Sequence, residues 1–350
     1  MIKRRKTKVV KIGKLKIGGN FPVLVQSMTN TKTSNVKATV RQIKELERAG
    51  CEIIRVGVPD LKSAKALAKI RKEIKIPLVA DIHFSAELAL EAIAQGVDKL
   101  RINPGNFPKS ELFKIAALCE KKRIPIRIGV NSGSLEKDIL GEHKNVTAEM
   151  MVKSAVRNIR LMENLGFYDL VVSLKAPDVF RAVRAYEMLS EKVDYPLHLG
   201  VTEAGGEFSG TIKSAIALGF LLQKGIGDTI RVSLTGEPIK EVKVGWEILK
   251  NLEIRERGVR IVSCPTCART SIDVVGIVKK VEKLTGQIEK PLKLAIMGCV
   301  VNGLGEGREA DLAIVGSGPI ALIMKNGKII NRVKEKDIFR VFEKELKTFL

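Results

Sequence analysis

Short apolar runs alternate with longer amphipathic stretches along most of the chain. Strand-sized runs between helix-sized stretches are typical of βα units and a parallel sheet. The pattern predicts strands at 23–28, 52–57, 77–82, 99–103, 126–131, 170–175, 197–202 and 229–234. It predicts helices between and after them, at 35–49, 61–73, 85–95, 109–122, 146–165, 178–191, 210–223 and 238–251.

Strand–helix pairs of this number and total length match a (β/α)8 TIM barrel, an α/β fold. An open doubly wound sheet is the competing architecture, but no GxGxxG segment follows a predicted strand. The amino-terminal stretch "KVVKIGKLKIGG" alternates on both sides of Gly13, which predicts a hairpin at the amino-terminal face of the barrel. We therefore expect residues 1–251 to form a barrel domain that begins with this hairpin.

The composition changes near "LEIRERG", residues 252–258. Beyond it we expect a strand at 259–263, a helix at 268–284, strands at 293–298 and 310–316, a hairpin with the turn signal "KNG", and a helix at 335–348. Residues 259–350 thus form a second, smaller α+β domain.

The formal net charge of the 350-residue chain is +22. Nucleic-acid binding is one interpretation. However, the lysines lie beside glutamates on helices, and three Tyr and one Trp offer little for base stacking. A basic chain also suits an anionic substrate or an acidic electron carrier. No signal peptide and no apolar run of membrane-spanning length is apparent, so we expect a cytoplasmic protein.

Basic residues lie near the carboxyl ends of five predicted strands, where barrel enzymes place their chemistry. They are Arg55, Arg101, Arg127, Lys175 and Arg231. Converging cations repel one another unless an anion fills the site, so we infer a small phosphate or diphosphate ester as substrate. Glu203 is the carboxylate best placed for proton transfer. His83, which follows Asp81, is a further candidate with no assigned role.

Three of the five cysteines lie in the second domain: Cys264 and Cys267 in "SCPTC", and Cys299 in "IMGCVVNGLGEG". This domain has no fourth Cys and no His, so it cannot complete a zinc site by itself. A thioredoxin-type disulfide would leave Cys299 unexplained. Three thiolates suit an iron–sulfur cluster with one iron not bound by Cys.

An oxygen ligand for that iron is available in a glycine-rich segment expected to be a loop. Glu306 is the candidate, and Glu309 and Asp311 lie nearby. The remaining cysteines, Cys51 and Cys119, fall in the barrel half, where we expect them to be buried as small hydrophobic residues.

Together with these cysteines, the segments "SMT", "RVGVP", "DIHF", "RINPGN", "RIGVNSGSL" and "HLGVTEAG" resemble the 4-hydroxy-3-methylbut-2-enyl diphosphate synthase family. The resemblance covers nearly the whole chain and is to the bacterial two-domain form. It implies an iron–sulfur oxidoreductase of isoprene biosynthesis. Such an enzyme opens, reduces by two electrons and dehydrates 2-C-methyl-D-erythritol 2,4-cyclodiphosphate.

The resemblance also implies site residues and partners. A 4Fe–4S cluster would be held by Cys264, Cys267, Cys299 and Glu306, and substrate by Arg55, Arg101, Arg127, Asn131, Lys175, Arg231 and Ser233. Glu203 matches the family's barrel carboxylate. Flavodoxin or ferredoxin would deliver electrons to a head-to-tail homodimer whose active site is shared between subunits. Two alternatives stay open: a pterin-binding barrel methyltransferase, and a basic nucleic-acid-binding protein with a structural metal.

Overall fold

The computed structural model describes residues 2–350 of the chain. Internal contacts divide the chain into two compact units, of which the first ends at Arg255 and the second begins at Glu256. No helix in the described part of the chain is long and apolar enough to cross a membrane.

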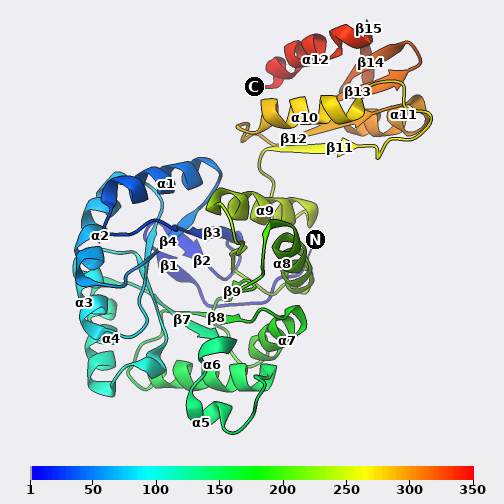
Figure 1. Cartoon of the computed structure of the whole chain (residues 1–350). Helices are drawn as coiled ribbons and strands as arrows, with labels where there is room; N and C mark the ends of the chain where they lie inside the picture. Colours follow the sequence, from blue (N-terminus) through cyan, green and yellow to red (C-terminus); the bar gives the residue numbers. More distant parts are fainter. Residues whose placement is uncertain (1) are drawn as a thin grey trace. The chain divides into compact units, whose positions relative to one another are not determined.

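The first unit is a parallel barrel (Figure 1). Its strands are β3 (Leu24–Met28), β4 (Ile53–Gly57), β5 (Leu78–Asp81), β6 (Lys99–Ile102), β7 (Ile126–Asn131), β8 (Leu170–Lys175), β9 (His198–Leu199) and β10 (Thr229–Ile230). The order β8-β7-β6-β5-β4-β3-β10-β9 brings the last strand back to the first, where Val172 and Leu197 form a parallel bridge. The predicted TIM barrel is confirmed, and the doubly wound sheet is excluded.

Two strands are shorter than the sequence predicts. The runs at 197–202 and 229–234 contribute only two ladder residues each, in β9 and β10. Beyond these residues isolated backbone hydrogen bonds keep the two segments close, such as the bond from Arg231 N to Leu199 O at 3.0 Å. The apolar pattern therefore marks the path of the chain better than it marks the length of the ladder.

Helices surround the barrel and agree with the predicted spans to within a few residues. They are α1 (Val36–Arg48), α2 (Leu61–Glu73), α3 (Ala86–Ala94), α4 (Lys109–Lys122), α6 (Ala148–Glu163), α7 (Val179–Ser190), α8 (Glu207–Gln223) and α9 (Pro238–Asn251), with a short α5 (Lys137–Leu140) before α6. Their starts follow local chemistry: Asp60, Ser85 and Asp178, for example, cap α2, α3 and α7 by accepting a backbone N–H bond.

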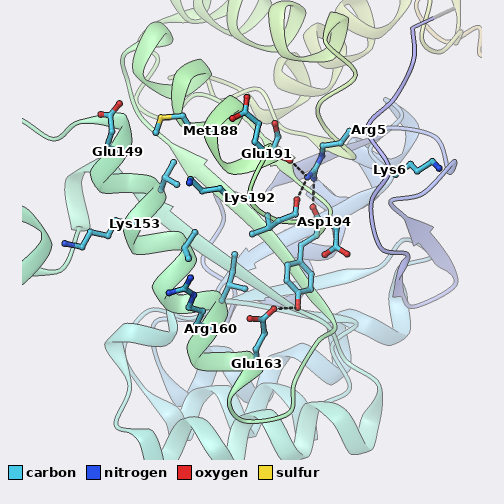
Figure 2. Close-up of a pocket in the computed structure, with 16 residues that line it drawn as sticks. Arg5, Lys6, Glu149, Lys153, Arg160, Glu163, Met188, Glu191, Lys192 and Asp194 are labelled. Carbon is cyan, nitrogen blue, oxygen red and sulfur yellow. Dashed lines mark hydrogen bonds between the residues drawn. The ribbon is translucent and has the colours of Figure 1, made fainter.

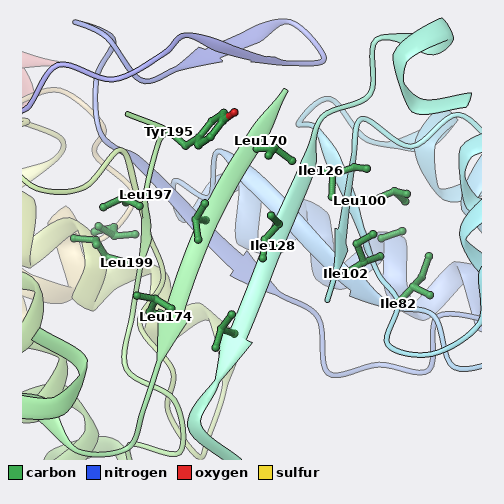
Figure 3. Close-up of a cluster of buried hydrophobic side chains, with 14 of the residues drawn as sticks. Ile82, Leu100, Ile102, Ile126, Ile128, Leu170, Leu174, Tyr195, Leu197 and Leu199 are labelled. Carbon is green, nitrogen blue, oxygen red and sulfur yellow. The ribbon is translucent and has the colours of Figure 1, made fainter. Parts of the chain in front are cut away.

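The main hydrophobic core lies between the strands and these helices. Ile126 and Ile128 of β7 and Leu100 of β6 belong to it, as Figure 3 shows. Because side chains alternate along a strand, the residues between them face the barrel interior. On β6 and β7 these interior residues include Lys99, Arg101 and Arg127, so the inside of the barrel is strongly cationic.

The amino-terminal hairpin, β1 (Val10–Ile12) with β2 (Leu15–Ile17), closes the opposite end of the barrel from the strand carboxyl ends. Its buried side chains form one cluster with the first inward-facing residues of four strands. The cluster comprises Val10, Ile12, Ile17, Leu24, Ile53, Val79 and Val171. The hairpin thus forms an apolar floor beneath the cationic interior.

The second unit is an α+β layer structure. Its sheet has the order β11 (Val259–Ser263), β12 (Leu292–Met297), β13 (Leu312–Ser317), β14 (Ile320–Lys325) and β15 (Lys328–Lys334), parallel through β13 and antiparallel afterwards. Helices α10 (Val274–Thr285) and α12 (Ile338–Leu346) pack on one face, and α11 (Val300–Glu309) packs on the other.

The expectation of a flexible glycine-rich loop after Cys299 is wrong, because these residues form helix α11. Gly303 and Gly307 are buried against the sheet. A Cβ on Gly303 would lie 2.4 Å from Cγ1 of Val315, and one on Gly307 would lie 2.6 Å from Sδ of Met324. These glycines therefore allow the helix to pack closely on the strands.

Candidate functional site

The barrel interior gathers the basic residues that the sequence singles out. Arg55, Arg101, Arg127 and Lys175 come from β4, β6, β7 and β8 and are all buried, and Arg127 is fully inaccessible. Arg231 follows β10, and its side chain is 16% exposed. The sequence analysis missed Lys99, which is also fully buried. Its position two residues before Arg101 on β6 is the signal that would have found it, since such residues face the same side.

One carboxylate lies among these cations. Oδ1 of Asp81 is 3.1 Å from Nη1 of Arg101, and its Oδ2 is 3.5 Å from Nε of Arg55. Burial disfavours the charged carboxylate, yet Arg55, Arg101 and Arg127 together hold the pKa of Asp81 at about 2. Burial also lowers the pKa of Arg55 to about 10, against the opposing effect of Asp81.

A second buried carboxylate comes from α9 and was not anticipated. Glu241 lies 3.3 Å from Nη2 of Arg231. It also accepts hydrogen bonds from Oγ of Ser27 at 3.2 Å and from the backbone N of Leu234 at 3.0 Å. Glu241 thus links two strand ends and orients Arg231 at the rim of the cationic interior.

Several donors in this interior have no hydrogen-bond partner among residues 2–350. They are Nε and Nη1 of Arg127, Nζ of Lys99 and Nζ of Lys175. Burial, reinforced by neighbouring cations, lowers the pKa of each of these three side chains well below its ordinary value. Buried donors without partners are costly, and a bound anion would satisfy them. The interior therefore has the chemistry of a polyanion site.

Two glycines make room for these cations. A Cβ on Gly129 would lie 2.2 Å from Nε of Arg101, and one on Gly200 would lie 2.8 Å from Nζ of Lys175. Both glycines lie on the inner side of the barrel wall, where side chains would displace the basic groups.

The other candidates lie at the same end of the barrel. Asn131 ends β7 and Ser233 follows β10, and both are half-buried. Glu203 is exposed, and it forms no hydrogen bond or ion pair within the part of the chain that the structure describes. Its φ of 52° is left-handed, which is uncommon for a residue other than glycine. The sequence places Glu203 among the basic residues of the barrel, but its carboxylate contacts none of them in residues 2–350.

His83 lies beside the Asp81 cluster. Its Nε2 is 2.8 Å from Nη1 of Arg101, and its side chain is 50% exposed. Burial and the Arg101 charge lower the pKa of His83, which favours the neutral ring. It lines, with Asp81, a pocket of about 590 Å³ at the carboxyl ends of β3, β4 and β5. This pocket is an opening beside the cationic interior.

A pocket of about 970 Å³ lies elsewhere, between the amino-terminal arm, α6 and the segment after α7 (Figure 2). There Arg5 donates hydrogen bonds to the backbone oxygens of Ser190, Val193 and Tyr195. Because these residues precede β9, the pocket lies at the amino-terminal end of the barrel. Its basic and acidic side chains are mixed, and the arginine already serves the backbone, so we attribute to it a structural role.

In the second unit, Cys264, Cys267 and Cys299 line one pocket of about 180 Å³. Cys264 directly follows β11, and Cys299 occupies the position just before the first residue of α11. The pocket therefore lies at the carboxyl ends of parallel strands. A helix amino terminus also favours negative charge, which suits a thiolate at Cys299.

Local hydrogen bonds shape the Cys264–Cys267 loop. Gly298 N donates to Sγ of Cys264 at 3.2 Å, and Cys267 N donates to Oγ1 of Thr270 at 3.0 Å. Thr270 N in turn donates to the Cys267 carbonyl at 2.9 Å. These turns occupy residues that the sequence assigned to a helix from 268, so α10 begins later, at Val274, after the cap residue Asp273.

The three thiols do not converge on one point. Across residues 2–350, no three His, Cys, Asp or Glu side chains are grouped to hold a single metal ion. A cluster of several irons has no such requirement, because each iron takes its own thiolate. Three cysteines around one pocket, with no fourth cysteine lining it in residues 2–350, therefore fit an iron–sulfur cluster better than a lone ion.

The structure separates the three candidate carboxylates. Glu309 pairs with Nζ of Lys293 at 2.9 Å, and Asp311 accepts from Lys293 N at 2.7 Å. Both lie at the amino-terminal ends of β12 and β13, away from the cysteines. Glu306 is half-buried on α11, seven residues after Cys299 and so on the same side of the helix, although it does not line the pocket.

The remaining cysteines behave as expected from the sequence. Cys51 and Cys119 are buried in the barrel half, and burial raises the pKa of both thiols to about 12. They are therefore poor ligands and nucleophiles.

Comparison with known proteins covers both units. The family model described as "GcpE TIM-barrel domain" matches residues 7–246, and "GcpE protein C-terminal domain" matches residues 260–348. Similar curated proteins are named "4-hydroxy-3-methylbut-2-en-1-yl diphosphate synthase (flavodoxin)". The one from Caldanaerobacter subterraneus is 56% identical over 99% of this chain and 98% of its own. That from Clostridium acetobutylicum is 52% identical over 99% of each chain.

The solved structures that are similar to this chain share its barrel fold. Dihydropteroate synthase from Stenotrophomonas maltophilia is similar over 71% of this chain and 97% of its own, with a TM-score of 0.54 and 15% identity. N-acetylneuraminic acid synthetase from Leptospira borgpetersenii is similar over 72% and 91%, with a TM-score of 0.53 and 13% identity. At such identity the likeness shows a shared fold and carries no function.

Proposed function

The chain belongs to the GcpE family, and from this premise we propose that it catalyses the reaction for which its relatives are named. The substrate would be 2-C-methyl-D-erythritol 2,4-cyclodiphosphate, and the product 4-hydroxy-3-methylbut-2-enyl diphosphate. The ring is opened, two electrons are added, and one hydroxyl leaves as water after taking a proton. The enzyme is an oxidoreductase of isoprene biosynthesis.

The observation that carries this proposal is the set of buried, unpaired cationic donors inside the barrel. Arg127 and Lys175 offer free N–H groups to the diphosphate oxygens, and Arg101 is held in place by Asp81. Arg guanidinium groups suit phosphate oxygens in paired contacts. Asp81 and Glu241 neutralise only part of the positive charge of the basic residues. The remaining positive charge favours a multiply charged anion.

The smaller polar residues would complete substrate recognition. Asn131 and Ser233, at the ends of β7 and β10, would bind the hydroxyl groups of the carbon skeleton. Glu203 is free of partners in residues 2–350 and lies in a strained turn after β9. We assign to it the transfer of the proton that accompanies loss of water.

We further propose that Cys264, Cys267 and Cys299 hold a 4Fe–4S cluster, with Glu306 as the fourth ligand. When bound, the cluster would pass single electrons from the donor to the substrate. The three thiols around one pocket support this assignment, and the backbone N–H of Gly298 would stabilise the Cys264 thiolate. The relatives are named for flavodoxin, so we propose flavodoxin as the electron donor.

The path of the chain supports a homodimer with a shared active site. Arg255, the last residue of the barrel unit, donates to Val23 O at 2.9 Å and pairs with Glu52 at 2.7 Å. Both partners precede strands, so the chain leaves the barrel at the end opposite the cations. Residues 256–258 alone lead to β11 and span about 15 Å at most. We therefore propose that each cysteine unit serves the barrel of a second copy.

Neither alternative has an observation of its own in its favour. The likeness to dihydropteroate synthase shows a fold and accounts for no cysteine unit. A basic nucleic-acid-binding protein would need its cations on an open surface, whereas the six identified here lie inside a barrel or at its rim.

The reaction is tested on protein purified without oxygen, with iron and sulfide assayed before turnover. Reduced flavodoxin and the cyclodiphosphate should give the linear diphosphate. Arg127→Met should retain the iron but lose substrate affinity, because its unpaired donors would be removed. Iron-loaded protein that neither binds nor converts the cyclodiphosphate would contradict the proposal.

The shared site is tested by mixing two inactive variants, Glu203→Gln and Cys299→Ser. A heterodimer would contain one intact composite site, so activity should recover to a fraction of the wild-type value. No recovery in heterodimers isolated with two affinity tags would place the complete site within one chain.

A further inference from the structure

His83 lies just after β5 and has no part in the function proposed above. The chain is fixed on both sides of it, because Asp81 ends β5 and Ser85 caps α3. Between them, the carbonyl of His83 accepts a hydrogen bond from Nδ2 of Asn106 at 2.9 Å. Asn106 belongs to the turn after β6, the strand that carries Arg101. The backbone therefore holds the imidazole ring beside Arg101.

The contact between the ring and Arg101 decides which ring nitrogen carries the proton. Nε2 of His83 is 2.8 Å from Nη1 of Arg101, whereas Nδ1 is 3.4 Å from the same atom. A guanidinium group can only donate, so Nε2 must accept, and a neutral ring then carries its proton on Nδ1. The Nδ1–H group can be solvated, because the ring lines the pocket of about 590 Å³ and is 50% exposed.

The charges around the ring favour its neutral form. Burial, reinforced by Arg101 on β6 and Arg55 on β4, lowers the pKa of His83 below the ordinary value of 6.5. Asp81 on β5 acts in the opposite direction, but its Oδ1 lies 3.6 Å from Nε2, beyond hydrogen-bond distance. Lys32 also lines the pocket and adds a further positive charge. The ring therefore acts as an acceptor for Arg101 at neutral pH.

His83 and Asp81 together occupy one end of the Arg101 guanidinium group. Nη1 has two N–H bonds, and the two acceptors beside it are Oδ1 of Asp81 at 3.1 Å and Nε2 of His83 at 2.8 Å. Nη2 donates to Gly129 O at 3.2 Å. Nε has no partner in residues 2–350. The N–H of Nε and one N–H of Nη2 therefore remain for an anion.

Two other roles fit His83 less well. A metal ligand needs a free ring nitrogen and further ligands, but Nε2 contacts Arg101. Across residues 2–350 no three His, Cys, Asp or Glu side chains are grouped to hold a metal ion. A general acid needs a ring that is protonated near neutral pH, which burial and the neighbouring arginines oppose.

We propose that His83 is a positioning residue: its Nε2 accepts from Nη1 of Arg101 and, together with Asp81, directs the free N–H groups of Arg101 toward the substrate diphosphate. The inference rests on the proposed function, because that function gives Arg101 an anion to hold. Its first measurement needs no substrate, so the two proposals can fail separately.

The first test observes the ring directly. The full chain is prepared with isotope-labelled histidine, and proton–nitrogen correlation spectra distinguish the two neutral tautomers. At neutral pH His83 should carry its proton on Nδ1, and its signals are identified by their loss in His83→Gln. In Arg101→Met this preference should disappear and the pKa of His83 should rise, because a neighbouring positive charge is removed. A neutral wild-type ring with its proton on Nε2 would overturn the proposal.

The second test measures affinity for the cyclodiphosphate by calorimetry without a reductant. His83→Ala should weaken binding about tenfold, since Arg101 keeps Asp81 but loses its second acceptor to water. His83→Gln should restore most of the affinity, because the amide oxygen can accept the same bond without ionising. His143→Ala is the matched control, since His143 is exposed in the loop before α6. Circular dichroism should show that all variants are folded.

A double substitution shows whether His83 acts through Arg101. In an Arg101→Met background, His83→Ala should cause no further loss, because no guanidinium group remains to be oriented. A general structural role would add its loss to that of Arg101→Met. An additive loss, equal weakening by Gln and Ala at position 83, or wild-type affinity in His83→Ala would each overturn the proposal. Wild type that binds no cyclodiphosphate would contradict the proposed function, and the tautomer spectra would then decide the bond between His83 and Arg101 alone.

Discussion

Asp81 and Arg101 face each other across β5 and β6, with 3.1 Å between Oδ1 and Nη1. Asp81 also lies 3.5 Å from Nε of Arg55, so one carboxylate holds two buried guanidinium groups. Arg101 also donates from Nη2 to Gly129 O at 3.2 Å, and its Nη1 lies 2.8 Å from Nε2 of His83. This arrangement fixes two cations before any anion arrives and leaves Arg127 and Lys175 with unpaired donors.

Replacement of Asp81 by Asn should destabilise the fold. Removing one partner of a buried ion pair costs about 3–5 kcal/mol, because the other charge stays buried without compensation. The urea midpoint of the full chain at neutral pH should fall accordingly. Asp60→Asn is the control, since Asp60 is an exposed helix cap and Asn caps a helix about as well as Asp, so the midpoint should hardly change.

The same carboxylate sets a pH dependence. The pKa of Asp81 is about 2 in the folded chain against 3.8 ordinarily, so its contribution is complete above pH about 4. As the pH falls from about 4 to 2, roughly 2 kcal/mol should be lost from wild type. Asp81→Asn should lack this part of the acid dependence. Parallel pH profiles of the two proteins would show that Asp81 is not held ionised by the arginines.

Lys99→Met should stabilise the protein. Lys99 is fully buried with no partner for Nζ in the described chain, and Met is a flexible apolar residue of similar length. The gain should be on the order of the 1–4 kcal/mol reached where buried ion pairs are replaced by apolar residues, because the cost of burying the ammonium group is removed.

The pH dependence distinguishes this cause from better packing. Since burial lowers the folded pKa of Lys99, the unfolded chain binds more protons, and wild-type stability rises with pH. The advantage of Lys99→Met should therefore shrink as the pH approaches 10.5, the ordinary lysine value. A pH-independent gain would show that the pKa of Lys99 is not lowered in the folded chain.

The barrel could be predicted from sequence because its strands are continuous apolar runs and its helices have clear caps. The cationic site could be predicted in part, since Arg55, Arg101 and Arg127 break apolar strands at positions that face inward. Lys99 was missed because it opens its strand and reads as an ordinary solvated residue at a strand start. Glu241 was missed because it lies between Lys240 and Lys243 on α9, a charge pattern typical of an exposed helix face.

The cysteine unit shows a different limit. A run rich in glycine predicts a loop by composition, yet "VVNGLGEGRE" is helix α11. Helix propensity was overridden by tertiary packing, because glycine lets the helix approach Val315 and Met324 closely. No local signal in the sequence distinguishes a glycine that bends the chain from one that admits a neighbouring strand.

A pair of substitutions tests this role of glycine. Gly303→Ala would place its Cβ 2.4 Å from Cγ1 of the stiff Val315 and should cost about 1–3 kcal/mol. Gly305 has nothing within 4 Å, so Gly305→Ala should be neutral or gain up to about 1 kcal/mol of helix stability. Hydrogen exchange of residues 300–309 in the full chain measures both. Faster exchange in Gly305→Ala would favour the loop interpretation.

Glu306→Ala separates cluster assembly from ligand identity. Glu306 shares the Cys299 side of α11, whereas Glu309 and Asp311 are engaged by Lys293 at the far end of the strands. Because the three cysteines remain, the variant should still bind iron and sulfide under anaerobic reconstitution. Its iron should be lost faster to a chelator, since one iron would have no protein ligand, and turnover should fall.

A carboxylate is also a harder and weaker partner for iron than a thiolate, so Glu306→Cys should retain iron longer than wild type and give an altered visible and electron paramagnetic spectrum. Glu309→Ala is the matched control, because its carboxylate already pairs with a surface lysine. If Glu306→Ala and Glu306→Cys both release iron at the wild-type rate with unchanged spectra, Glu306 is not a ligand, and the fourth position belongs to another group.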